Sequence, residues 1–371
     1  MSGLSGATAL PGQSPIGSAA ARYLRACRRL PVDTTPVWFM RQAGRALPEY
    51  RAMRHRVSLE AAIADPALAA EITLLPVTRL GVDAAIVFAD ITTPLPGLGI
   101  RVQLVDGVGP VVEAPVRSAA DLDRLAPAID PGAFEPTAAA VRLVRDASPV
   151  PVIGFAGAPF TLACYLVEGA GARTEFPNLR RLMRREPATV ERLLDRLADL
   201  AVGALRAQVE AGAAAVQLFD SWVGGLSPAD YRRFVRPPMR RLLDGLGDLG
   251  VPVTVFGIGT AGLLGEIAAT GGDVIGLDWR VDLGDGWQRV GEGRAVQGNL
   301  DPWLLLGPWP EIEAATRAIL AAAGGRPGHI FNLGHGVHPE TDPDVLRRLV
   351  DLVHEAGSRG AEPPNRTPKR T

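Results

Sequence analysis

The sequence contains very little cysteine and almost no lysine. Cys27 and Cys164 are the two cysteines of the 371 residues, and Lys369 is the single lysine among 39 basic residues. Two isolated cysteines cannot build a disulfide framework or a structural zinc site, and so low a content is typical of a reducing compartment. Arginine is therefore nearly the sole cation that can hold an acidic ligand.

Long apolar runs and targeting signals are also missing. No stretch reaches the roughly 18 uninterrupted apolar residues that a membrane-spanning helix needs. The N-terminal residues 1–18 lack the basic start and apolar run of a secretory signal. A net charge of −1 gives no global field that would attract nucleic acid or an anionic membrane. We expect a cytoplasmic protein without nucleic-acid or membrane partners.

Several cofactor and nucleophile motifs are absent as well. The chain has no Walker A phosphate loop, no GxGxxG fingerprint after a predicted strand and no GxSxG elbow. It also has too few suitably spaced cysteines for a zinc site of the His/Cys/Cys kind. We therefore expect neither an organic cofactor nor a metal.

Short apolar runs alternate with longer amphipathic stretches along most of the chain. Hydrophobic residues make up 47% of it, which is ample for a large core. Continuous apolarity favours strands that are covered on both faces, as in parallel sheets. Eight strand–helix units in series predict a single (β/α)8 barrel over residues 19–356, with disordered tails at 1–18 and 357–371. The eight runs are residues 37–40, 84–88, 151–155, 214–219, 252–256, 273–277, 294–298 and 329–333.

The connecting segments carry signals for helices and for one hairpin. Asp65 and Ser227 each precede a proline and are typical N-cap residues. Residues 178–212 predict two helices that are broken near Pro187. Residues 97–116 predict a β-hairpin inserted after the second strand, with its turn near Asp106-Gly107.

Polar residues follow several of the predicted strands. In a (β/α)8 barrel the catalytic groups lie at the C-terminal ends of the strands, so these residues share one rim. Each could alone be a turn-former, but no local turn rule places all of them at one face. The residues at these ends are Arg41, Arg45, Asp90, the segment from Gly157 to Tyr165, Asp220, Ser221, Asp278 and His335.

The first strand end is strongly basic. Between Arg41 and Arg56 the chain has five arginines and His55 against one acid, Glu49. The outer arginines are equally consistent with a solvated helix face. Arg41 and Arg45 lie nearest the strand, and their guanidiniums suit bidentate binding of carboxylates, with phosphate as an alternative.

Three further residues have two interpretations each. Asp90 is either an ion-pair partner of an arginine or an acceptor for ligand N–H groups that can also stabilise a cation. His335 lies between glycines, so it belongs either to a polar loop or to a site that a ligand approaches closely. Tyr165 on its predicted helix is either a core residue or a site residue.

Two long segments and four shorter ones resemble the uroporphyrinogen decarboxylase family. PVWFMRQAGRALPEYR (36–51) and GFAGAPFTLACYLVEG (154–169) are similar to its two signature stretches, and the shorter blocks follow in the family's order. The resemblance extends from about residue 20 to 355. The shorter blocks are LFDSW, GLDWR, QGNLDP and NLGHGVHPETDP.

The resemblance implies a cytoplasmic (β/α)8-barrel carboxy-lyase of haem biosynthesis, generally a homodimer, that works without metal or cofactor. Such enzymes convert uroporphyrinogen III to coproporphyrinogen III by removing the carboxyl groups of four acetate side chains as CO2. The resemblance assigns Asp90 to the pyrrole N–H groups at the centre of the cleft. It assigns to substrate binding Arg41, Gln42, Ala43, Gly44, Arg45, Tyr165, Ser221 and His335.

The implied chemistry explains the expected lack of a cofactor. Protonation of an electron-rich pyrrole ring creates a cationic electron sink, which pyridoxal phosphate supplies in many other decarboxylases. Asp90 is expected to stabilise that cation. Arg41 is a candidate proton donor although a guanidinium gives up its proton reluctantly, and Tyr165 or a water held by His335 are alternatives.

The sequence departs from some relatives at two positions and leaves three rival functions. Gly259 lies in a loop without ionisable residues where some relatives carry lysine, and Trp222 stands where some have histidine.

A zinc-dependent methyltransferase of the same superfamily would need His and Cys ligands at strand ends. A non-catalytic porphyrinogen carrier would not need Asp90. A barrel enzyme for phosphorylated substrates is disfavoured by the long family-like segments.

Overall fold

A computed structural model of the chain describes residues 19–44, 46–105, 107–170 and 175–358. The predicted N-terminal tail and most of the predicted C-terminal tail lie outside the described residues. Arg45 and the predicted turn residue Asp106 also lie outside them.

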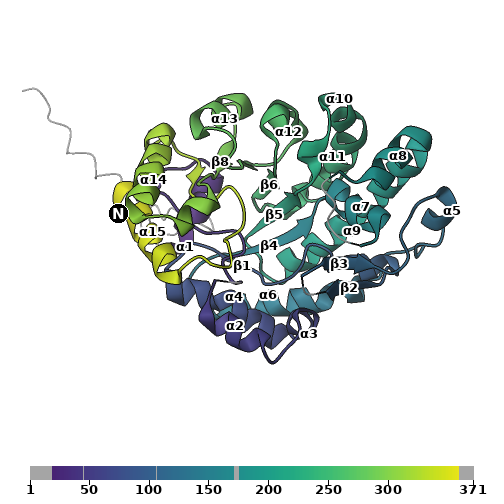
Figure 1. The fold of residues 1–371 in the computed structure, drawn as a ribbon, viewed down its shortest axis with the longest axis horizontal. Helices are drawn as coiled ribbons and strands as arrows, with labels where there is room; N and C mark the ends of the chain where they lie inside the picture. Colours follow the sequence, from purple (N-terminus) through teal and green to yellow (C-terminus); the bar gives the residue numbers. More distant parts are fainter. Residues whose placement is uncertain (1–18, 45, 106, 171–174, 359–371) are drawn as a thin grey trace, which may run out of the picture.

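A parallel sheet forms the centre of the molecule. Within the described residues it has seven strands in the order β1-β4-β5-β6-β7-β8-β9, and Figure 1 shows helices packed around it. Every neighbouring pair of strands is parallel. This arrangement confirms the α/β barrel prediction. The strands are β1 Ala85–Ile86, β4 Val152–Gly157, β5 Ala215–Asp220, β6 Val253–Gly257, β7 Val274–Gly276, β8 Ala295–Gln297 and β9 His329–Ile330.

The chain around Val37 closes the sheet between its two edges. Val37 forms an isolated parallel bridge with Phe331, and its carbonyl accepts a hydrogen bond of 2.8 Å from Asp83 N, just before β1. The prediction of a strand over residues 37–40 was wrong beyond this bridge. Side chains bind the backbone there instead: Phe39 N donates to Gln42 Oε1 at 2.9 Å, and Met40 N donates to Asn332 Oδ1 at 3.1 Å.

The helices cover the outside of the sheet (Figure 1). No helix among the described residues is long and apolar enough to cross a membrane. The α-helices are α1 Ala19–Cys27, α2 Pro48–Arg54, α3 Leu59–Ala64, α4 Pro66–Leu80, α5 Ala119–Leu122, α6 Glu135–Ala147, α7 Pro159–Glu168, α8 Pro177–Arg185, α9 Pro187–Glu210, α10 Pro228–Asp230, α11 Arg236–Asp244, α12 Leu264–Thr270, α13 Leu283–Val290, α14 Trp309–Ala323 and α15 Pro343–Ala356. Short 3-10 turns are η1 Leu95–Leu98, η2 Pro131–Phe134, η3 Val223–Gly225, η5 Gly247–Leu249, η6 Ala261–Leu263 and η7 Pro302–Leu306, and η4 Tyr231–Val235 is a π-helical turn.

The predicted helix starts are confirmed where an N-cap residue precedes proline. Asp65 caps α4 by accepting hydrogen bonds from Ala67 N at 2.9 Å and Leu68 N at 3.2 Å. Ser227 caps α10 in the same way. The predicted break near Pro187 separates α8 from α9, because a proline suits the first turn of a helix and not its interior.

A β-hairpin outside the barrel sheet follows β1. It consists of β2 Val102–Val105 and β3 Gly109–Val112, which pair antiparallel with Leu104 opposite Pro110. Its base is attached to the end of α7, because Val112 N donates to Gly169 O at 2.5 Å. The opposite end of the hairpin reaches toward the C-terminal face of the barrel.

The inside of the barrel is layered. Near the C-terminal ends of the strands, Phe219 makes edge-to-face contacts with Phe155 and Phe256, with ring centroids 5.5 and 6.1 Å apart. Deeper inside, Gln297 accepts from Trp38 Nε1 at 3.0 Å and donates to Gln217 Oε1 at 3.1 Å. The aromatic layer therefore separates this buried polar layer from the space above it.

Candidate active site

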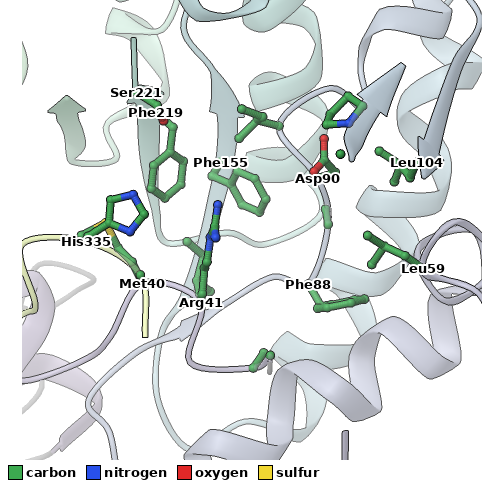
Figure 2. A pocket seen from close by; sticks show the side chains of 18 of the residues that line it. Met40, Arg41, Leu59, Phe88, Asp90, Leu104, Phe155, Phe219, Ser221 and His335 are labelled. Atoms are coloured by element: carbon green, nitrogen blue, oxygen red, sulfur yellow. The ribbon is translucent and has the colours of Figure 1, made fainter. Parts of the chain in front are cut away.

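A cavity of about 470 Å3 opens at the C-terminal ends of the strands. Its lining includes the aromatic layer of Phe155, Phe219 and Phe256. Figure 2 shows side chains from several strand ends converging on it. Of the residues that the strand ends or the family resemblance assign to the site, those that line the cavity are Arg41, Ala43, Gly44, Asp90, Tyr165, Ser221 and His335.

Asp90 lies in the tight turn that follows β1. Its carboxylate oxygen Oδ1 accepts hydrogen bonds from Thr92 N at 2.9 Å and from Thr92 Oγ1 at 2.6 Å. Oδ2 accepts none from the described part of the chain. These two donors fix the orientation of a carboxylate that lines the cavity (Figure 2). One oxygen is thus available to a ligand donor.

Arg41 reaches into the cavity from a strained backbone position (Figure 2). Its φ of 62° lies in the left-handed region, which costs a residue other than glycine about 1 kcal/mol. A Cβ added to Gly336 would lie 2.5 Å from Arg41 Cδ. Only a glycine at position 336 therefore provides the space that the aliphatic part of the Arg41 side chain occupies. Ala43 and Gly44 continue the cavity wall, and Arg45 lies outside the described residues. Strain of this kind is typical of functional sites.

Gln42 holds this loop from behind. Its side chain is buried, and its amide nitrogen donates to Ala84 O at 2.9 Å while its amide oxygen accepts from Phe39 N at 2.9 Å. The side chain is not among the residues that line the cavity. Gln42 is therefore placed to support the loop, and its expected role in substrate binding has no side-chain contact with the cavity.

Tyr165 and Ser221 line a different part of the cavity. Tyr165 lies on α7, and its ring makes an edge-to-face contact with Trp222 at 6.3 Å between centroids. Burial raises the pKa of the Tyr165 phenol, and the nearby negative charge of Asp90 adds to this rise while Arg41 opposes it. The phenol therefore keeps its proton at neutral pH. Ser221 follows β5 directly, and both it and Trp222 line the cavity.

His335 lies in the loop after β9 and is uncharged at neutral pH. Burial lowers the pKa of the imidazole to about 4, and the positive charge of Arg41 adds to the effect. The ring stands edge-on to Trp279 with centroids 5.9 Å apart. A neutral imidazole can donate and accept hydrogen bonds, but it does not bind a carboxylate as a cation.

Asp220 is a strand-end residue that does not line the cavity. Its buried Oδ1 accepts from Thr161 Oγ1 at 2.8 Å, and the same hydroxyl accepts from Trp222 N at 3.3 Å. Burial raises the pKa of Asp220 to about 7. Through Thr161 this carboxyl group holds the turn that presents Ser221 to the cavity.

Replacing Asp220 with asparagine should remove a pH dependence of stability. Because its pKa rises on folding, the native state binds more protons than the unfolded state between about pH 4 and 7, and stability falls as pH rises through that window. The shift corresponds to a loss of up to about 4 kcal/mol. Urea unfolding at pH 4 and pH 8 should show this loss in the wild type and a smaller one in Asp220→Asn. Equal losses in both proteins would contradict the assignment.

Asp278 is also buried away from the cavity and organises loops. Its carboxylate accepts from the backbone of Gly259, from Arg280 N at 3.0 Å and from Arg280 Nη1 at 3.0 Å. These bonds join the loops after β6 and β7. The shortlist of strand-end residues therefore contains two carboxylates with structural surroundings, Asp220 and Asp278, beside one that lines the cavity.

Sequence reasoning missed the apolar part of the cavity wall. Leu104, Val105 and Val108 of the hairpin and Leu59 at the start of α3 line it. The predicted hairpin gave the secondary structure around Leu104, Val105 and Val108, but no sequence signal showed where the hairpin would lie.

The two cysteines are free and buried, and burial raises the pKa of both thiols, that of Cys27 to about 12. Among the described residues, no group of three or more His, Cys, Asp and Glu side chains is arranged to hold a metal ion.

Comparisons with known proteins agree on one family. The family model described as uroporphyrinogen decarboxylase (URO-D) matches residues 18–356. A uroporphyrinogen decarboxylase from Salinispora tropica is 51% identical over 348 residues, which cover 94% of each chain. The protein of that name from Streptomyces coelicolor is 51% identical over 348 residues, which cover 94% of this chain and 98% of the relative.

A solved structure supports the fold. A methyltransferase from Methanosarcina mazei superposes with a TM-score of 0.71 over 91% of this chain and 98% of its own length. Its sequence identity is 20%, so the likeness concerns the barrel and not the chemistry.

Proposed function

The chain belongs to the uroporphyrinogen decarboxylase family, and we propose that the cavity at the C-terminal face of its barrel is the site of decarboxylation. It is a carboxy-lyase of porphyrin biosynthesis. The proposed reaction converts uroporphyrinogen III to coproporphyrinogen III with release of four molecules of CO2. The observation that carries the proposal is that Asp90 and Arg41, from two different strand ends, line the same cavity.

The substrate can hold the electrons of its own reaction. A proton added to the ring carbon beside the pyrrole nitrogen makes a cationic, iminium-like ring. The C–C bond to the acetate carboxylate then breaks, CO2 leaves, and the electron pair returns to the ring. A proton taken up at the exocyclic carbon completes the methyl group, and the proton first added to the ring carbon leaves, which restores the pyrrole. Each cycle thus consumes one proton and one carboxylate and needs no redox partner.

We assign the stabilisation of the cationic ring to Asp90. A fixed carboxylate that faces a developing positive charge lowers the barrier more than a mobile one, because it needs no reorganisation. Thr92 supplies that fixation through its two hydrogen bonds to Oδ1. The same carboxylate can accept the pyrrole N–H groups through its other oxygen.

The proton donor is proposed to be Arg41, whose guanidinium lies in the cavity with Asp90 (Figure 2). Tyr165 and a water molecule held by His335 are the alternatives. The pKa of Tyr165 is raised, so the phenol carries a proton at neutral pH and can donate it. Substrate carboxylates are proposed to bind Arg41, Ser221 and the backbone at Ala43 and Gly44.

His335 should act without changing its charge in the working pH range. Because its pKa is lowered to about 4, the imidazole is neutral from about pH 5.5 upward. We therefore expect kcat/KM of the wild type and of His335→Asn to keep a constant ratio between pH 5.5 and 8. A ratio that changes about tenfold near pH 6.5, the ordinary histidine pKa, would show that an imidazolium binds the substrate.

The protein is further proposed to work as a homodimer in the cytoplasm, without nucleic-acid or membrane partners. The two free, buried cysteines suit a reducing compartment. The net charge of −1 offers no general attraction for polyanions. Sedimentation at micromolar concentration tests the dimer.

Anaerobic incubation with uroporphyrinogen III tests the function. Chromatography should resolve intermediates with seven, six and five carboxylates before the four-carboxylate product. Binding of the substrate without loss of carboxylates would instead favour a porphyrinogen carrier.

A further inference from the structure

The hairpin forms an apolar wall on one side of the cavity. Leu104, Val105, Val108 and Pro110 line the cavity from the hairpin, and Leu59 joins them from α3. Val105 and Val108 are 40% and 49% exposed, among the most exposed large apolar side chains of the described chain. We call these five residues the hairpin wall.

The hairpin wall stands apart from the cationic side of the cavity. Figure 2 shows Leu104 and Leu59 on the side of Asp90 that is remote from His335, with Arg41 between Asp90 and His335. A ligand held with its centre at Asp90 would therefore present one edge to Arg41 and another to the hairpin wall.

Core packing does not account for these exposed side chains. The hairpin is anchored at its base, where Val112 N donates to Gly169 O and Val111 forms a bridge with Ala170. A two-stranded hairpin has little stability of its own. Apolar residues at its free end gain no burial inside the barrel, yet they gather at the mouth of the cavity instead of being scattered singly.

We propose that the hairpin wall is the subsite for the methyl groups that the reaction creates, and that it selects partly decarboxylated substrate; this rests on the proposed function. Each cycle replaces CH2COO− by CH3 with uptake of one proton and loss of CO2. A carboxylate against the wall would lose water without gaining a partner. A methyl group there gains about fourfold in affinity from burial of its apolar surface.

The wall thus sets the order of affinities along the reaction. The substrate with eight carboxylates has an acetate on every pyrrole ring, so whichever ring faces the hairpin brings an acetate carboxylate toward the wall. Intermediates with fewer carboxylates can turn a methylated ring toward the wall and bring an unreacted acetate to Asp90. The later decarboxylations therefore depend on the wall more than the first does.

The test uses Val105→Thr/Val108→Thr, which adds two hydroxyl groups while keeping side-chain shape and strand propensity. Val111→Thr is the matched control, because Val111 lies on β3 but does not line the cavity. Thermal unfolding of all three proteins checks that the hairpin substitutions leave the fold intact. Initial rates are measured anaerobically with the eight-carboxylate and the five-carboxylate porphyrinogen.

We expect the double variant to lower kcat/KM about tenfold for the five-carboxylate intermediate and less than about twofold for the eight-carboxylate substrate. The five-carboxylate intermediate should then accumulate. Equal losses for both substrates, no loss for either, or the same pattern in Val111→Thr would overturn the proposal. A wild type without turnover on any porphyrinogen would refute the proposed function instead.

Discussion

Replacing Asp90 with alanine should reduce kcat about a thousandfold while the protein stays folded. A preorganised group that faces a developing charge is worth a factor of about 100 to 1,000 in kcat, and Asp90 is the only carboxylate among the described residues that line the cavity. Its carboxylate is half-buried and, among the described residues, accepts hydrogen bonds from Thr92 alone. Its loss should therefore cost little stability. Turnover is measured anaerobically with uroporphyrinogen III.

Asp90→Asn separates charge from shape. The amide oxygen can still accept from Thr92, so the turn after β1 keeps its geometry. We expect this variant to be nearly as inactive as the alanine variant, because the developing cation loses its counter-charge. Near-normal activity of Asp90→Ala would remove Asp90 from the chemistry. Near-normal activity of Asp90→Asn alone would show that its hydrogen bond matters and its charge does not.

Replacing Arg41 should weaken binding of carboxylated porphyrinogens about 10- to 100-fold. Hydrogen bonds to charged groups contribute roughly 1.5–3 kcal/mol, and Arg41 lines the cavity with its charged side chain. Arg41→Gly is the informative variant. Glycine tolerates the φ of 62° at this position, so the free energy of unfolding should rise by about 1 kcal/mol as the affinity falls. Titration with coproporphyrinogen and urea unfolding measure the two effects.

Gly336→Ala tests whether the position of the Arg41 guanidinium matters for binding, because it displaces the side chain without removing its charge. The added Cβ would lie 2.5 Å from Arg41 Cδ and 2.8 Å from Cγ, so the arginine stem must move. Affinity should fall with the positive charge retained. Gly284→Ala is the matched control, because nothing lies within 4 Å of the Cβ it would add. Unchanged affinity in both Arg41→Gly and Gly336→Ala would make Arg41 a structural residue.

Local sequence patterns predicted most of the barrel because local chemistry decides those features. Asp65 caps a helix by accepting from the backbone of the next turn, and Pro187 favours the first turn of one. The run at residues 37–40 is different. The N–H groups of Phe39 and Met40 are bound by the side chains of Gln42 and Asn332, and Asn332 lies far along the chain. The apolar pattern of residues 37–40 fits a strand as well as it fits this side-chain-bound segment, so the pattern alone could not tell the two apart.

The candidate site was predictable as a rim but not residue by residue. Asp90 and Asp220 both follow a buried strand, and nothing in the pattern separates them. The difference arises from packing: the hydroxyl of Thr161 on α7 draws the carboxyl of Asp220 away from the cavity. The hairpin wall was not predicted because its place depends on the attachment of β3 to Gly169 at the end of α7.

A structure of the protein with coproporphyrinogen III, prepared without oxygen, tests the role of Asp90 most directly. The carboxylate that Thr92 orients should accept hydrogen bonds from the pyrrole nitrogens, with N···O distances of about 2.7–3.2 Å, and the propionates should extend toward Arg41. A macrocycle that seats with its nitrogens turned away from Asp90, while the enzyme in solution still releases CO2, would contradict the proposed electron sink.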